Sequence, residues 1–227
     1  MKLTWWKILT ILLLIYTVIG GFLMPVPRLP IVNESIRNLY FHVPMWFSML
    51  GILTISMVYS IRYLRSNQEK ADLYAVESAN VGIFLGILGI ITGMIWAQFT
   101  WGTFWHGDPK QNASAIALLI YLAYSVLRTS LEDQQQRARI SAVYNIFAYA
   151  TLIPLLFILP RLTDSMHPGN GGNPGFNSYD LDSTMRLVFY PAVLGWTLLG
   201  WWLVSLRVRW RILQNKYLEQ SLEVVNN

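Results

Sequence analysis

The sequence predicts an all-α membrane protein, built as a bundle of six transmembrane helices. Apolar residues make up 54% of the 227 residues and charged residues only 13%, which is too apolar for a soluble domain of this length. Six charge-free runs, each of about 18 residues or more, are long enough to cross a bilayer. They cover residues 8–24, 43–61, 78–107, 111–127, 140–160 and 187–206.

The expected helices form one domain, residues 1–227, because neither an internal repeat nor a long linker divides the chain. Their approximate bounds are 5–24, 43–64, 79–98, 109–131, 140–159 and 186–206. The chain has no cysteine, which excludes disulfides and thiolate metal sites.

The first helix begins like a secretory signal, with Lys2 and Lys7 before an apolar run. No small-residue cleavage site follows that run, and the Met-Pro-Val-Pro sequence at residues 24–27 ends the helix. We therefore expect an uncleaved membrane anchor.

The second helix is expected to start just after His42, because Pro44 fits a first helical turn. The positive end of a helix dipole disfavours a charged imidazolium at that point. His42 is therefore expected to be neutral and available as a ligand, with an N-terminal cap or an interfacial histidine as the structural alternative.

The third helix carries a stripe of glycines that predicts close packing against a neighbouring helix. The stripe consists of Gly82, Gly86, Gly89 and Gly93, and Trp96 prolongs it. The charge-free run is longer than one membrane span, so its tryptophan-rich end is expected to lie along the membrane surface between helices 3 and 4. If residues 96–106 continue as a helix, Trp101 and Trp105 share one face and His106 borders them.

The fourth helix has a strong start signal. Asp108 fits an N-cap, Pro109 the first helical position and Gln111 the third, as in a capping box. Asp108 is therefore expected to act mainly as a cap, while Lys110 is available to meet an anion.

The fifth and sixth helices contain Pro154 and Pro191, which suggest kinks. Between these helices lies a long loop around His167, with too many glycines and prolines for helix or strand. Trp196, Trp201, Trp202 and Trp210 are expected to belong to an interfacial belt.

Basic residues predict the orientation, because Lys and Arg resist translocation. One side of the predicted bundle carries Lys2, Lys7, Arg62, Arg65, Lys70, Arg128, Arg137, Arg139, Arg207, Arg209, Arg211 and Lys216. The other side carries Arg28, Arg37, Lys110, Arg161 and Arg186. Both termini are therefore expected in the cytoplasm. The net charge of +5 describes a basic cytoplasmic rim, and no fold signature for nucleic-acid binding occurs.

All three histidines fall on the outer side of this topology. They could be solvated loop residues. Two neutral imidazoles from separate segments could instead bind one iron from opposite faces, and His106 competes with His42 and His167 for that role.

Trp-Gly-Thr-Phe-Trp at residues 101–105, followed by Asp-Pro-Lys at 108–110, resembles a tryptophan-rich signature. This signature belongs to the haem-handling family of cytochrome c-type biogenesis that includes CcmC, CcmF and CcsA. Phe-His-Val-Pro at residues 41–44 and Met-Arg at 185–186 are also similar, and the six-helix layout is similar to the CcmC (haem exporter protein C) branch. The chain departs from the signature at Gly107, where a further tryptophan is usual.

The resemblance implies transient, non-covalent binding of haem b at the outer face of a bacterial cytoplasmic (inner) membrane, facing the periplasm or exterior. It implies His42 and His167 as axial ligands of the haem iron, with His106 as a weaker candidate. The porphyrin-binding residues are expected to be Trp101, Gly102, Trp105 and Asp108, with Lys110, Arg28 and Arg186 as candidate partners of the propionates.

The implied role is delivery of haem to a membrane-anchored chaperone similar to CcmE. Subunits similar to CcmA, CcmB and CcmD are the implied partners. No nucleotide-binding motif occurs in this chain, so an ATPase partner would supply any ATP energy and the chain is not expected to be an enzyme.

Two other functions are alternatives to haem delivery. A b-type electron-transfer or quinone-reacting subunit would carry its histidines within helices facing the bundle core. A permease would need polar residues at mid-membrane depth, and the predicted spans have almost none.

Overall fold

The structure is a computed structural model that describes residues 4–29, 31–167 and 181–225, with side chains up to residue 222. Every regular element within these ranges is a helix, as predicted. Six of them are long and apolar enough to cross a membrane. They are α1 (Trp5–Leu23), α2 (Leu39–Ser66), α3 (Glu69–Trp101), α4 (Pro109–Thr129), α5 (Gln134–Ile153) and α6 (Ser183–Val225).

Three short helical segments complete these elements. The 3-10 helix η1 (Asn33–Asn38) leads without a break into α2. After α5 the backbone changes to a π-helical turn, η2 (Pro154–Ile158), and then to a 3-10 turn, η3 (Leu159–Arg161). Proline lacks the amide hydrogen that α-helical bonding requires, which explains the change at Pro154. Pro191, by contrast, lies inside a continuous α6.

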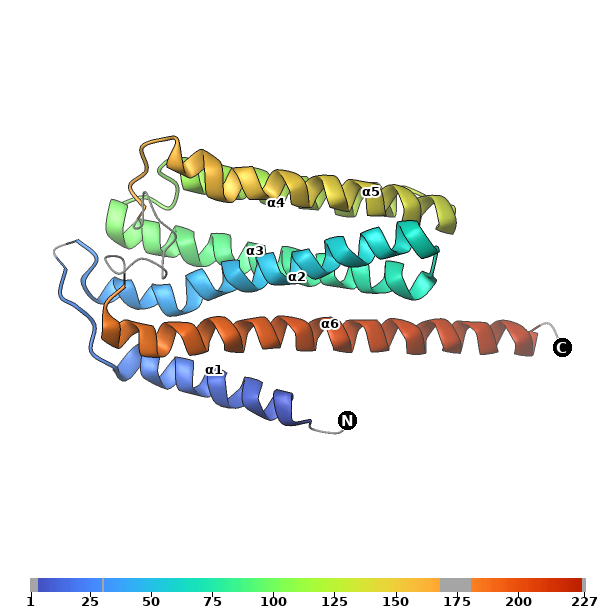
Figure 1. Ribbon diagram of the computed structural model, residues 1–227, viewed down its shortest axis with the longest axis horizontal. Coiled ribbons are helices and arrows are strands. Elements are labelled where there is room, and N and C mark those ends of the chain that lie inside the picture. The colour runs from blue at the N-terminus through green and yellow to red at the C-terminus, as the bar shows by residue number, and fades with distance from the viewer. Residues whose placement is uncertain (1–3, 30, 168–180, 226–227) are drawn as a thin grey trace.

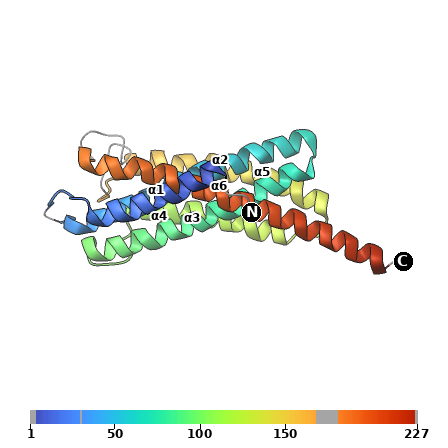
Figure 2. The same cartoon turned by 90° about the horizontal axis from the view of Figure 1, so that it is seen from below.

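The six long helices run side by side, with α2 and α3 in the middle of the bundle (Figure 1). The α4–α5 hairpin covers one side of this pair, and α6 followed by α1 covers the other. We call the end at which α6 finishes the terminal end, and α6 projects beyond the other helices there, whereas α1 starts part-way along the bundle (Figures 1 and 2). We call the opposite end, which carries His42, His106 and His167, the histidine end.

The glycine stripe of α3 packs against α2, which confirms the predicted close packing. A Cβ atom at Gly89 would lie 2.8 Å from the Trp46 ring, and one at Gly86 would lie 3.0 Å from the Met49 sulfur. Small residues let helix backbones approach closely where no water drives association. The stripe therefore fixes α2 directly on α3, the arrangement that positions His42.

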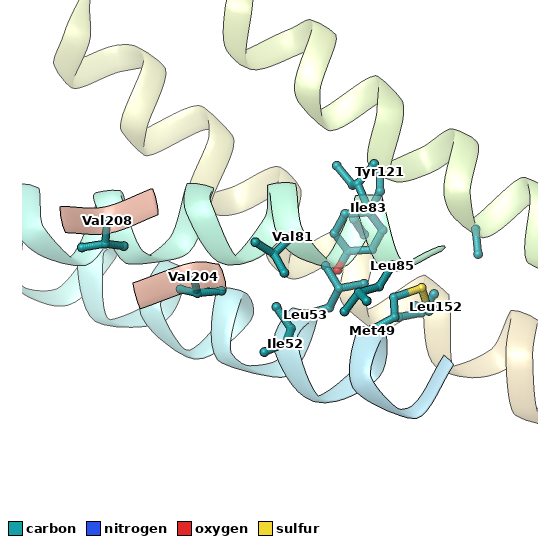
Figure 3. Close-up of a cluster of buried hydrophobic side chains, with 12 residues drawn as sticks. Met49, Ile52, Leu53, Val81, Ile83, Leu85, Tyr121, Leu152, Val204 and Val208 are labelled. Carbon is teal, nitrogen blue, oxygen red and sulfur yellow. The ribbon is translucent and has the colours of Figure 1, made fainter. Parts of the chain in front are cut away.

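The main apolar core lies where five helices meet (Figure 3). Its buried side chains come from α2, α3, α4, α5 and α6, and they include Met49, Ile52, Leu53, Val81, Leu85, Tyr121, Leu152, Val204 and Val208. α1 lies outside this core and packs on α6 instead, with Leu13 against Gly195.

Ion pairs join the helices towards the terminal end. Arg128 of α4 donates both guanidinium arms to Asp72 of α3. The buried carboxylate of Glu77 accepts hydrogen bonds from Arg207 at 2.5 Å and Arg211 at 3.1 Å, both on α6. These pairs hold α3 against α4 and α6.

Several helices differ in length from the predictions, although their number and order are confirmed. α2 and α3 are longer than the expected 43–64 and 79–98, and α6 continues far beyond the expected end at residue 206. α5 begins earlier than the expected 140–159 and ends at Ile153. Apolar runs locate the part of a helix that can lie in lipid, whereas backbone hydrogen bonding continues through charged turns on either side.

Candidate functional site

His42 lies inside α2 rather than just before its first turn, so the predicted start of this helix is wrong. η1 and the first residues of α2 are already helical, and Pro44 is an internal residue. Proline at this point removes one backbone hydrogen bond, the one to the Tyr40 carbonyl, which the surrounding helix tolerates. His42 is therefore held by regular helix on both sides.

Contacts with α3 fix the orientation of the His42 ring. Its Nδ1 atom lies 3.1 Å from the Thr92 hydroxyl oxygen. That hydroxyl already donates its hydrogen to the carbonyls of Leu88 and Gly89, so it can only accept from His42. The proton of a neutral ring is thus on Nδ1, and Nε2 keeps a free lone pair, the form that binds a metal.

Gly93 makes room for this ring. A Cβ atom at Gly93 would lie 2.8 Å from His42 Cε1, closer than carbon atoms tolerate. Gly93, the last glycine of the packing stripe, therefore also provides the space that the His42 ring occupies.

His167 is oriented in the same way by a different partner. Its Nδ1 atom lies 2.8 Å from Oδ1 of Asp108, whose side chain is only 1% exposed. Burial lowers the pKa of the His167 ring, although the neighbouring Asp108 carboxylate opposes the shift. The ring is therefore neutral near pH 7, donates from Nδ1, and keeps its Nε2 lone pair free.

Asp108 caps α4, as predicted, by accepting a hydrogen bond from the Lys110 amide at 2.8 Å. The same carboxylate accepts from the Met166 amide at 2.8 Å and from the Ser165 hydroxyl at 3.0 Å. Burial raises the pKa of Asp108, but these hydrogen bonds and the His167 ring lower it below its usual value. One ionised carboxylate therefore joins the start of α4 to the loop that carries His167.

The predicted capping box is only half formed. Gln111 reaches back with its Oε1 atom to the amide of His106 at 3.0 Å, not to the cap residue itself. This bond helps to fold residues 103–108 back over the start of α4.

Two tryptophans of α3 surround His167. The Trp101 ring centre is 4.8 Å from that of His167, and the Trp96 ring centre is 6.1 Å from it. The two tryptophans are themselves 5.3 Å apart, edge to face. Trp96 was not among the predicted site residues, although its place in line with Gly89 and Gly93 was the signal that could have found it.

Trp105 does not join this group, because the conditional prediction of a helix through residue 106 is wrong. α3 ends at Trp101, and Gly102 adopts a left-handed conformation with φ of 79°. The Trp105 ring is 40% exposed and donates to Asn112 Oδ1 at 3.2 Å. Trp101 and Trp105 therefore do not share a face.

Gly107 also needs its left-handed backbone, with φ of 80°. L-residues with side chains rarely adopt this conformation, so the tryptophan usual at this point in the family signature would be strained here. The neighbouring His106 is exposed, and its ring centre is 6.1 Å from Trp101.

The candidate cations differ in their positions. Lys110 is close enough to His167 to affect its pKa electrostatically. Arg28 is exposed between α1 and η1, and Arg186 donates from Nε to the Leu181 carbonyl. Arg37 binds the Gly21 and Met24 carbonyls, so it caps the end of α1.

The last turns of α3 bring the two ring systems together. His42 packs against Thr92 and Gly93, while His167 packs against Trp96 and Trp101 further along the same helix. The two imidazoles lie close enough for a charge on one to disfavour a charge on the other. Residues 168–180, the remainder of the glycine- and proline-rich loop, lie outside the described residues.

Comparison with known proteins identifies the family of the chain. A protein-family profile described as "Heme exporter protein C" (CcmC) matches residues 1–223. The chain belongs to the CcmC family.

Individual relatives are more distant than this match suggests. The chain is 28% identical over 141 residues to "Heme exporter protein C" of Rhodobacter capsulatus, covering 62% of this chain and 58% of that protein. It is 30% identical over 125 residues to the protein of the same name from Paracoccus denitrificans, covering 55% and 51%. It is also 40% identical over 82 residues to "Cytochrome c biogenesis protein CcsA" of Prochlorococcus marinus, covering 36% and 26%. The chain thus aligns with about half to three fifths of the length of these two CcmC relatives.

Proposed function

We propose that this CcmC-family protein binds haem at its histidine end, with the iron between Nε2 of His42 and Nε2 of His167. The observation that carries the proposal is the matched orientation of the two rings. Thr92 accepts a hydrogen bond from Nδ1 of His42, and Asp108 accepts one from Nδ1 of His167. Both Nε2 lone pairs are therefore left free at the histidine end. Six-coordinate haem iron requires two such axial ligands.

The composition of the site favours haem over a bare metal ion. Among the described residues, no cluster of three or more His, Cys, Asp or Glu side chains could enclose a metal. Two imidazoles suit an iron that a porphyrin already holds through four nitrogens. Trp96 and Trp101 supply flat apolar surface beside His167 for the macrocycle, and Lys110 supplies a positive charge for a propionate.

We further propose that haem is held here for transfer to a membrane-anchored chaperone similar to CcmE, with subunits similar to CcmA, CcmB and CcmD as partners. The family match supports this role, as does the position of all three histidines at one end of the bundle, near the start of α2, after α3 and after η3. Haem at the periplasmic face of the cytoplasmic membrane would be accessible to a partner there. A b-type electron-transfer subunit would instead need its haem deep within the helices.

The proposal is tested by purifying the full chain, with and without His42→Ala or His167→Ala, from cells that make haem. We expect the unaltered protein to carry haem with a low-spin bis-histidine visible spectrum, and each variant to lose that spectrum. His106→Ala is the matched control, because His106 borders Trp101 but has an exposed ring. Retention of the spectrum in both ligand variants would refute the site.

Delivery is tested separately by co-expressing a CcmE-type chaperone and measuring the haem that it acquires. We expect the chaperone to be loaded with the unaltered protein and not with either ligand variant. A chaperone loaded equally in all three cases would refute delivery while leaving haem binding intact.

A further inference from the structure

α6 is longer than a membrane span requires. It runs unbroken from Ser183 to Val225, 43 residues, which corresponds to about 64 Å at ~1.5 Å per residue. The hydrocarbon layer of a bilayer is only about 30 Å thick. The last turns of α6 therefore stand beyond both the membrane and the rest of the bundle, in line with the spanning part (Figures 1 and 2).

The C-terminal part of α6, from Leu206 onwards, carries an exposed stripe with the spacing of a coiled coil. Leu206, Trp210, Leu213, Tyr217 and Gln220 follow one another at alternating intervals of four and three residues. Trp210 is 69%, Leu213 63% and Tyr217 73% exposed. A shallow groove is lined by Trp210, Leu213, Tyr217 and Gln220 of this stripe, together with Gln214 and Lys216. We call these five residues the α6 seam.

The bundle cannot cover the seam, because the seam faces away from it. Val204 and Val208 are buried in the main core, and at about 100° per residue Val208 points some 200° away from Trp210. α1 covers the neighbouring side of α6 only as far as Trp202, which meets Trp6 near the start of α1. Beyond that point the seam is uncovered in the described structure.

Charge around the seam indicates what kind of helix fits it. Arg209 and Lys216 directly precede Trp210 and Tyr217, the a positions of the heptad, so they occupy g positions and flank one edge of the seam. Gln214 and Arg207 flank the other edge, and Arg207 is already paired with Glu77. Among the described side chains of the projecting part, the acidic one, Glu219, lies on the opposite face. A partner with acidic flanks would therefore gain ion pairs along the seam.

A second copy of the chain fits less well. Antiparallel pairing would bring the Arg209 and Lys216 edge against itself, which is repulsive. Parallel pairing would place Trp210 and Tyr217 against their own copies in the core, where β-branched or leucine side chains pack best. An anionic bilayer also fits poorly, because a helix that continues straight out of the membrane cannot lay its apolar stripe on the surface.

We propose that the α6 seam is the docking site for an acidic amphipathic helix of a protein partner, which pairs with α6 as a coiled coil at the terminal end. The partner helix carries apolar residues at heptad spacing and Glu or Asp beside them. This inference is independent of haem binding, since it concerns the opposite end of the bundle.

The test uses the full chain in lipid nanodiscs and two synthetic peptides of about four heptads. Both peptides carry leucine at the core positions; one carries glutamate and the other lysine at every flanking position. We expect fluorescence anisotropy to show the glutamate peptide binding roughly ten-fold tighter or more, with a preference that weakens as salt rises. Equal binding of the two peptides, or binding of neither, overturns the proposal.

Variants of the chain locate the binding. Trp210→Ala combined with Tyr217→Ala should abolish it, and Arg209→Glu combined with Lys216→Glu should reverse the preference towards the lysine peptide. Ile212→Ala is the matched control, an exposed apolar residue on another face of the same turns, and should bind normally. If the seam variant binds as well as the unaltered chain, the docking site is elsewhere and the proposal fails.

The absence of native cysteine allows a single probe at Leu213→Cys to distinguish the other occupants. We expect a spin label there to be mobile and water-accessible in anionic vesicles, and to become immobile when the glutamate peptide is added. Disulfide-linked dimers of this variant, or burial of the label in lipid, would identify a second copy or the bilayer as the occupant and overturn the proposal.

Discussion

His167 donates a hydrogen bond from Nδ1 to the carboxylate of Asp108, 2.8 Å away, across 59 residues of sequence. That carboxylate is also the N-cap of α4. A residue whose local pattern predicts a purely structural role therefore also determines which nitrogen of a distant histidine is free.

Asp108→Asn separates the two roles of Asp108. Asparagine caps helices about as well as aspartate, so α4 should remain folded. The amide can present its NH2 group to the ring and no longer favours the Nδ1 proton, so we expect haem affinity to fall by about 10- to 100-fold. Haem titration of the purified variant measures this loss. Asp133→Asn, which replaces the N-cap of α5, is the control and should bind haem normally.

Thr92→Val removes the acceptor for His42 while nearly preserving side-chain shape. With Nδ1 unpaired, the ring can rotate or change tautomer, and we expect roughly ten-fold weaker haem binding with an altered low-spin spectrum. Thr17→Val removes an equivalent hydroxyl that bonds only within α1 and should leave the spectrum unchanged. An unchanged spectrum in Thr92→Val would show that the hydroxyl does not orient the ligand.

Gly93→Ala should displace the His42 ring. The added carbon would lie 2.8 Å from His42 Cε1, and a rigid ring has no flexible end that could move aside. We expect loss of the bis-histidine spectrum from a protein that still purifies as a folded membrane protein. Gly51→Ala serves as the control, because its nearest neighbour would be Thr197 at an ordinary 3.8 Å. Normal haem content in Gly93→Ala would contradict the observed packing.

Trp96→Ala and Trp101→Ala should each reduce haem retention during purification, because both rings pack against His167. Trp105→Ala should have a smaller effect, since that ring is partly exposed and bonded to Asn112. Haem per protein after gel filtration gives the comparison. The opposite order would restore Trp105 to the binding surface and remove Trp96 from it.

Much of the fold can be predicted from local sequence because a helix that crosses a bilayer must contain a long apolar run. Six apolar runs predict six helices, and the glycine stripe and the Asp108 cap follow from spacing alone. The extensions of α2, α3 and α6 could not be predicted in this way, since charged turns carry no hydropathy signal. Polar continuations of membrane helices depend on neighbouring helices, such as the contacts of Arg207 with Glu77.

The candidate site was predictable by residue type more than by contact. His42 and His167 were identified as ligands through resemblance, but their partners Thr92 and Asp108 lie far away in the sequence and have ordinary local roles. The left-handed turn at Gly102 explains why Trp105 was wrongly placed beside Trp101. Because the backbone turns at Gly102, Trp101 contacts His167 and Trp105 does not lie beside Trp101.

The two imidazoles differ in how they are anchored. His42 is fixed by a continuous helix, whereas His167 lies in a loop segment that is hydrogen-bonded to Asp108 and packed against Trp96 and Trp101. Under the proposed function, His42 is the ligand that stays in place and His167 is the ligand that can move. Haem would leave on the His167 side, because breaking the Asp108 hydrogen bonds would release His167 without disturbing any transmembrane helix. Asp108, which orients one of the two proposed ligands, would then also determine how readily haem is released.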